Sequence, residues 1–118
     1  MKIIFVSNGS YERLVKEACN HPDTELTIVD SFIGCIESAA SFDPNFVITT
    51  YLLPDSTGSK LASSLKLINP QIKIFMLLDV APELPFDETL FSEIIHLPSN
   101  PLDLNRIIFS NPKNRRNI

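Results

Sequence analysis

The fold is decided by the stretch Phe46-Val47-Ile48-Thr49-Thr50-Tyr51-Leu52-Leu53-Pro54-Asp55-Ser56-Thr57-Gly58. Its first five residues are apolar or β-branched, which is typical of a strand buried on both faces. Pro54 and Asp55 then predict a turn, and a helical pattern begins directly after Gly58. Open α/β sheets bind ligands where a central strand ends in a loop, so this stretch also indicates where a site would lie.

Apolar runs of strand length alternate with helical patterns along the rest of the chain. Further strands are expected at 3–6, 26–29, 72–78 and 93–97, and helices after Ser10, Ser31, Gly58 and Asn100-Pro101. Ser10 and Ser31 are the expected N-caps of the first two helices. Pro82 and Pro85 fall where a fourth helix should begin, so only a short, degenerate element is expected there. The alternation predicts an α/β fold of five βα units: a doubly wound parallel sheet in a three-layer sandwich.

The composition predicts one folded domain and limits the kinds of partner. The chain has 118 residues and a net charge of −4, which argues against nucleic-acid binding by the domain itself. We expect the domain over residues 2–110 and a tail or the start of a linker over 111–118, where the cations of Lys113 to Arg116 lie. No apolar run reaches the roughly 20 residues that span a bilayer, so we expect a cytoplasmic domain without membrane insertion.

Few other side chains suggest chemistry. Cys19 and Cys35 fall in helical patterns and are expected to be small buried hydrophobes, with no CxxC motif. His21 and His96 lack partners at metal-ligand spacing, so no metal and no cofactor are predicted. Asp30 and Asp79 follow strands and are expected to cap helices or face solvent, and Asp55 is expected as a turn residue. On the last helix we expect Leu102, Ile107 and Ile108 to face inward.

The segment from Pro44 to Gly58 resembles the receiver domain of bacterial response regulators. That family has a proline and an aspartate, an apolar run, the phosphorylated aspartate, then Leu-Pro and a glycine. The resemblance covers Lys2 to about Phe109 and includes His96-Leu97-Pro98. It implies a flavodoxin-like fold with strand order 2-1-3-4-5.

The resemblance also implies that every functional position of the family is changed here. The phospho-acceptor falls on Thr50, the Mg²⁺-binding acidic pair on Ser7 and Asn8, the hydroxyl switch residue on Leu78 and the lysine on Leu97. Acyl-phosphate formation needs a carboxylate nucleophile, and Mg²⁺ prefers carboxylate oxygens. The resemblance therefore predicts a degenerate phosphorylation site in a filled pocket, and a protein that is not an enzyme.

From the resemblance we expect a pseudo-receiver: a phosphorylation-independent signalling module within a larger regulator. It would bind a protein partner, or a second copy as a homodimer, through the face made by the fourth helix, fifth strand and fifth helix. The candidate partner-binding residues are Leu84, Pro85, Phe86, His96, Leu104 and Ile108. Two alternatives stay open: a phosphoryl-accepting receiver or phosphocarrier with a non-standard site, and the N-terminal targeting domain of a ParA/MinD-like pilus-assembly ATPase. A carrier of the phosphotransferase-system type would have a cysteine where Ser7 stands.

Overall fold

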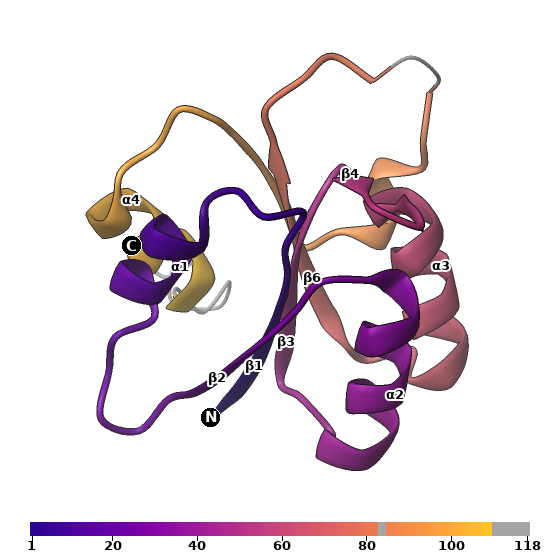
Figure 1. Cartoon of the computed structure of the whole chain (residues 1–118), viewed down its shortest axis with the longest axis horizontal. Helices are drawn as coiled ribbons and strands as arrows, with labels where there is room; N and C mark the ends of the chain where they lie inside the picture. The colour runs from indigo at the N-terminus through magenta and orange to yellow at the C-terminus, as the bar shows by residue number, and fades with distance from the viewer. Residues whose placement is uncertain (83–84, 110–118) are drawn as a thin grey trace, which may run out of the picture.

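A computed structural model describes residues 1–82 and 85–109, which form a parallel sheet between two layers of helices (Figure 1). The elements in chain order are β1 (Lys2–Val6), α1 (Glu12–Ala18), β2 (Glu25–Val29), α2 (Phe32–Phe42), β3 (Phe46–Thr50), β4 (Leu52–Leu53), β5 (Ser56–Thr57), α3 (Gly58–Ile68), β6 (Lys73–Leu78), the 3₁₀ helix η1 (Glu88–Leu90), β7 (Glu93–His96) and α4 (Pro101–Phe109). The sheet order is β2-β1-β3-β6-β7 with every pair parallel, so the predicted fold class and order of the five main strands are confirmed.

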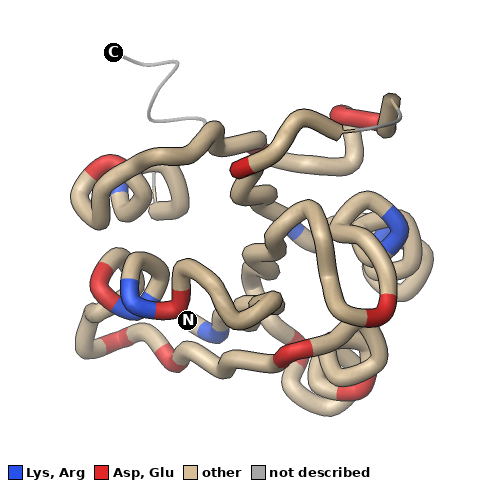
Figure 2. Tube along the Cα trace, turned by 45° about the horizontal axis from the view of Figure 1, so that its top comes forward, with Lys and Arg blue, Asp and Glu red and all other residues tan. Residues whose placement is uncertain are grey.

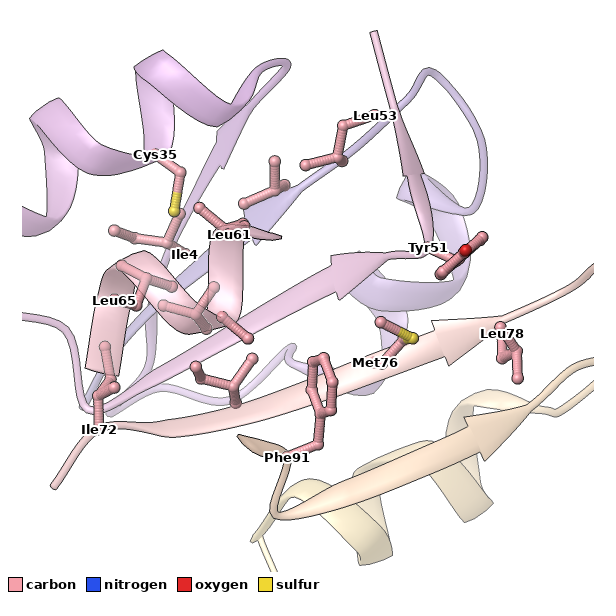
Figure 3. Packing of buried hydrophobic residues seen from close by; sticks show 14 residues of the cluster. Ile4, Cys35, Tyr51, Leu53, Leu61, Leu65, Ile72, Met76, Leu78 and Phe91 are labelled. Carbon is pink, nitrogen blue, oxygen red and sulfur yellow. The ribbon is translucent and has the colours of Figure 1, made fainter. Parts of the chain in front are cut away.

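The strand β3 lies at the centre of the sheet and is covered on both faces. The helices α1 and α4 cover one face, and α2 and α3 cover the other (Figure 1). All five residues of β3 are buried, as its apolar, β-branched sequence predicts for a central parallel strand. Figure 3 shows the core beneath α2 and α3, where Cys35, Leu61 and Leu65 pack toward Ile4 of β1. This layering brings the carboxyl end of β3 to an edge shared with β1, β6 and β7.

The fourth helix is degenerate, as predicted. Between β6 and β7 the only helical element among the described residues is η1. Pro82 and Pro85 precede it, and proline blocks the hydrogen bonds of a helix interior. The chain after β6 rises away from the sheet and returns beside α3 at η1 (Figure 1). A short antiparallel pair, β4 with β5, was not predicted and encloses the expected turn at Pro54 and Asp55.

The helix ends and faces follow the prediction only in part. Ser31 caps α2, and its hydroxyl accepts a hydrogen bond from the Gly34 N–H at 2.9 Å. The prediction that Ser10 caps α1 is wrong, because Tyr11 occupies the N-cap with a left-handed φ of 66°, and its side chain makes no capping hydrogen bond to the helix. The prediction that Leu102 faces inward is also wrong, because it is 62% exposed. The inward position of Ile108 is confirmed.

The structure also bears on two simpler predictions. Cys19 and Cys35 are both buried and free, as expected for small hydrophobes. Burial raises the pKa of the Cys19 thiol to about 11 and that of Cys35 to about 12. Across residues 1–82 and 85–109, no helix has the length and apolar character required to cross a membrane.

Candidate functional site

The five positions singled out by the resemblance meet at one edge of the sheet. Parallel neighbouring strands have their carboxyl ends at the same edge, and β1, β3, β6 and β7 lie side by side. The residues at or just after these ends are Ser7, Asn8, Thr50, Leu78 and Leu97. The fold therefore brings together the positions that the sequence could only place one by one.

Thr50 is fully buried, and its hydroxyl is already bonded within the chain. The Thr50 Oγ1 donates a hydrogen bond to the carbonyl oxygen of Leu52 at 3.0 Å. The side-chain amide of Asn8 donates to the same carbonyl oxygen at 3.2 Å. One backbone carbonyl thus accepts hydrogen bonds from the last side chain of β3 and from a side chain just after β1, its neighbour in the sheet. The hydroxyl hydrogen is thus bonded to a backbone carbonyl, which is not a general base, so the hydroxyl is poorly placed to act as a nucleophile.

The loop after β1 is closed by its own hydrogen bonds. Ser7 is buried, and its hydroxyl donates to the Ser10 carbonyl oxygen at 3.1 Å and accepts from the Gly9 N–H at 3.0 Å. The side-chain oxygen Oδ1 of Asn8 accepts from the Ser10 N–H at 3.1 Å. Gly9 has a φ of +97°, which glycine adopts without strain. Neutral side-chain oxygens that are engaged with the backbone make a weak set of ligands for a divalent cation.

Leucines occupy the remaining two positions of the site. Leu78 is buried at the end of β6, and Leu97 is half-buried just after β7. The Leu97 N–H donates to the Leu78 carbonyl oxygen at 2.9 Å, which continues the pairing of the two strands. Neither side chain can hydrogen-bond an anion, so this part of the edge is apolar.

Three carboxylates lie near this edge, and two of them have structural partners. Asp79 accepts a hydrogen bond from the Tyr11 hydroxyl at 2.7 Å, and this bond raises the pKa of Tyr11. Asp55 accepts from the Phe32 N–H at 2.8 Å and from the Ile33 N–H at 3.3 Å, and so caps α2 from a distant loop. These bonds, that of Phe32 foremost, lower the pKa of Asp55.

The third carboxylate, Asp30, is exposed beyond β2, in agreement with the expectation that it faces solvent. Within the described ranges, no group of three or more histidine, cysteine, aspartate or glutamate side chains could hold a metal ion.

The predicted partner-binding residues do not form one surface. Leu104 and Ile108 are 0% and 1% exposed, so their assignment to a partner-binding face is wrong: they belong to the core beneath α1 and α4. Pro85 and His96 are exposed, and Phe86 is half-buried. Leu84 lies outside the described residues. What remains on the surface is therefore split between the segment before η1 and the end of β7.

Phe86 is held in place by aromatic contacts. Its ring centroid is 5.8 Å from that of Tyr51 and 5.8 Å from that of Phe91, the latter edge to face. Tyr51 directly follows Thr50, so these contacts tie the segment before η1 to the end of the central strand. In Figure 3 Tyr51 lies at the end of β3, beyond Met76 and near Leu78.

A groove that the sequence did not predict runs beside these rings. Its volume is about 610 Å³. Its lining residues come from the end of β3 and the β4–β5 pair, the first turn of α3, and the segment between β6 and η1: Tyr51, Leu52, Thr57, Ser59, Lys60, Val80, Ala81, Pro85 and Phe86. The groove therefore adjoins the edge that holds Thr50, on the side where the fourth helix is degenerate.

Comparison with known proteins agrees on the fold. No family model matches the chain, and no curated protein matches it in sequence. Among solved structures, the chain is similar to a CheY-like response regulator receiver domain protein from Methanospirillum hungatei JF-1, with a TM-score of 0.79, 18% identity, and coverage of 98% of this chain and 96% of that one.

A receiver domain protein from Clostridium thermocellum gives a TM-score of 0.79 and 19% identity, over 98% and 96% of the two chains. The signal receiver domain of an HD domain-containing protein from Pseudomonas fluorescens Pf-5 gives 0.79 and 13%, over 99% and 98%. At such identities the likeness concerns the fold: the chain has the doubly wound architecture of response regulator receiver domains along nearly its whole length.

Proposed function

We propose that this chain is a signalling or regulatory module with a receiver fold that acts through protein contacts and is not phosphorylated. The proposal includes the absence of phosphoryl-transfer activity. Two features support it: the receiver-like architecture, and the hydrogen bonds at the carboxyl edge of the sheet. In receiver domains, this edge holds the phosphoryl group.

The observation that carries the proposal is the shared acceptor at Leu52. The Thr50 hydroxyl and the Asn8 amide both donate to its carbonyl oxygen, at 3.0 and 3.2 Å. A phosphoryl group on Thr50 would have to break the first bond and enter a fully buried position, whose register partner on β6 is the apolar residue Leu77. Without a cation or a cationic side chain to neutralise it, the transferred group would be buried with unpaired charge, which is strongly unfavourable.

Incubation with acetyl phosphate and Mg²⁺, followed by intact-protein mass spectrometry, tests the proposal. We expect no gain in mass, because a carboxylate nucleophile and a carboxylate-based Mg²⁺ site are both lacking at the aligned positions. A receiver domain that carries the acceptor aspartate is treated in parallel as a positive control, and its gain in mass shows that the acetyl phosphate is active. A gain of one phosphoryl group by the wild-type chain would overturn the proposal in favour of a non-standard phosphoryl acceptor. The Thr50→Val variant would then report whether Thr50 carries the group.

A further inference from the structure

We infer that the groove beside Tyr51 binds an acidic peptide segment of a partner protein, with apolar side chains seated in the groove and a carboxylate at Lys60. The inference rests on the proposed function in one respect: it names the class of partner that such a module would contact. It is carried by the shape, the apolar walls and the isolated charge of the groove.

The walls of the groove favour an apolar ligand. Tyr51 and Phe86 supply aromatic surface, and Val80, Ala81 and Pro85 supply aliphatic surface. Tyr51 and Phe86 contact each other at 5.8 Å, so this part of the wall is built by packing and is not assembled only when a ligand arrives. A volume of about 610 Å³ accommodates more than one bulky side chain.

The charge of the groove favours an acidic ligand. Among the described residues that line it, Lys60 is the one with a charged side chain. Lys60 forms no ion pair within residues 1–82 and 85–109, where the salt bridges join Arg13 to Glu17 and Arg106 to Asp103. Lys60 also stands in the first turn of α3, and the amino end of a helix favours negative charge. A free cation at the start of a helix, in a chain of net charge −4, therefore complements a carboxylate.

The apolar walls of the groove are themselves open to solvent, which favours a peptide over a small molecule. Leu52 and Val80 are 51% and 42% exposed although both line the groove. Small-molecule sites enclose most of their ligand, whereas exposed apolar surface with a charged rim is typical of protein contacts. The residues 113–116 of this chain carry three cations, so the charge of its own tail does not complement Lys60.

Titration of the wild-type chain with a short fluorescent peptide of alternating leucine and glutamate tests the inference by fluorescence anisotropy. The leucines of this peptide supply apolar side chains for the groove, and its glutamates supply a carboxylate for Lys60 at the same groove. We expect saturable binding, and at least a tenfold loss of affinity for two matched peptides, one with serine for leucine and one with lysine for glutamate. Absence of saturable binding by the first peptide, or equal binding of all three, would overturn the inference.

Variants of the chain locate the bound peptide. Lys60→Glu should weaken binding about tenfold, since it replaces an attraction by a repulsion at an exposed pair. The control is Lys16→Glu, which changes the net charge equally on α1, on the opposite side of the sheet from α3 (Figure 1). Figure 2 shows lysine and arginine on helices at both sides of the molecule, so such a control is available away from the groove. The double variant Leu52→Ser, Val80→Ser should weaken binding to a similar degree without unfolding the domain, because both side chains are already half-exposed. Equal effects of Lys60→Glu and Lys16→Glu would show a net-charge effect and refute the site.

Two further outcomes separate this inference from its alternatives. If the free chain sediments as a dimer and the Lys60→Glu variant sediments as a monomer, the groove binds a second copy of the chain. That result would overturn the inference that the groove binds an acidic peptide of a partner protein. Failure of peptide binding together with no gain of a phosphoryl group would refute the groove assignment and leave the proposed function standing. Phosphorylation of the chain would refute the proposed function, whatever the peptide does.

Discussion

Gly58, at the junction of the β5 strand and α3, is predicted to be intolerant of even one added methyl group. A Cβ built at this position would collide with the backbone carbonyl oxygen of Thr50, and it would lie 3.1 Å from Thr49 Cγ2 and 3.2 Å from Met76 Cε. The methionine methyl can move, but the Thr50 carbonyl is fixed at the end of the central strand. The Gly58 N–H also donates to the Tyr51 carbonyl oxygen at 2.7 Å, so the first turn of α3 cannot retreat without losing that bond.

The magnitude follows from two opposing effects. Overpacking a well-packed site costs about 1–3 kcal/mol. Replacing glycine by alanine in a helix interior gains up to about 1 kcal/mol, but Gly58 is the first residue of α3 and should gain less. Gly58→Ala should therefore lower the free energy of unfolding by about 2 kcal/mol.

Urea denaturation followed by far-ultraviolet circular dichroism measures this loss as a lower midpoint with an unchanged slope. Ser59→Ala, one residue along the same helix, is the matched control and should change stability by less than about 0.5 kcal/mol. Gly9→Ala provides a second comparison: it has open space around it and a φ of +97°, so its cost of about 1 kcal/mol is backbone strain alone. A Gly58→Ala variant as stable as wild type would refute the close approach of α3 to β3.

Three further predictions concern stability and thiol reactivity. Asp55→Asn should destabilise the domain at neutral pH, because the hydrogen bond from the Phe32 N–H lowers the folded-state pKa of Asp55. The stability that the Asp55 carboxylate contributes is present above its unfolded pKa of about 3.9 and is lost as the pH falls through the folded-state pKa. The urea midpoints of the variant and the wild type should therefore converge from neutral to acid pH. At pH 8 Cys19 and Cys35 should react with a chromogenic disulfide reagent far more slowly in the native than in the urea-unfolded chain, because burial raises their pKa values to about 11 and about 12. Leu104→Ala should lower the free energy of unfolding by about 2–5 kcal/mol, measured by the same urea method, because its side chain is fully buried.

The central strands β1, β3 and β6 were predictable because each contains a short, continuous and largely apolar run, which is typical of parallel strands covered on both faces. The expected bounds of β3, Phe46 to Thr50, coincide with the observed ones. The order of the strands in the sheet could not be predicted from the apolar runs, because periodicity does not determine the order of parallel strands. The prediction of that order came from the resemblance to receiver domains. The degenerate fourth helix was also predictable, because Pro82 and Pro85 act locally on the backbone.

The errors on α4 concern helical phase. Leu104 and Ile108 are four residues apart and share one face, whereas Leu102 lies two residues before Leu104 and points elsewhere. Grouping Leu102 with Ile108 as inward-facing ignored this spacing. Assigning Leu104 and Ile108 to a partner surface ignored that a pair at this spacing on the last helix of a sandwich must cover the sheet.

Other features depend on residues distant in sequence and had no local signal. Asp55 caps α2 although it is 23 residues from Phe32, so its turn position in the sequence revealed only part of its role. Tyr11 occupies the N-cap of α1 in place of Ser10. Its hydroxyl donates a hydrogen bond to Asp79, the residue directly after β6. The groove is built from three separate segments and could be found only after the fold had placed them together.

Leu52, in the segment from Thr50 to Gly58, takes part both in the edge of the sheet and in the groove. The Thr50 hydroxyl turns inward to the Leu52 carbonyl, while the Leu52 side chain points outward and lines the groove with Tyr51 and Thr57. The same residue, Leu52, therefore closes the edge of the sheet with its backbone and offers apolar surface with its side chain. Because Asn8 binds that carbonyl as well, the loop after β1 is joined to the wall of the groove through a single peptide unit. A partner seated in the groove would thus contact the residue whose carbonyl oxygen accepts hydrogen bonds from both Thr50 and Asn8.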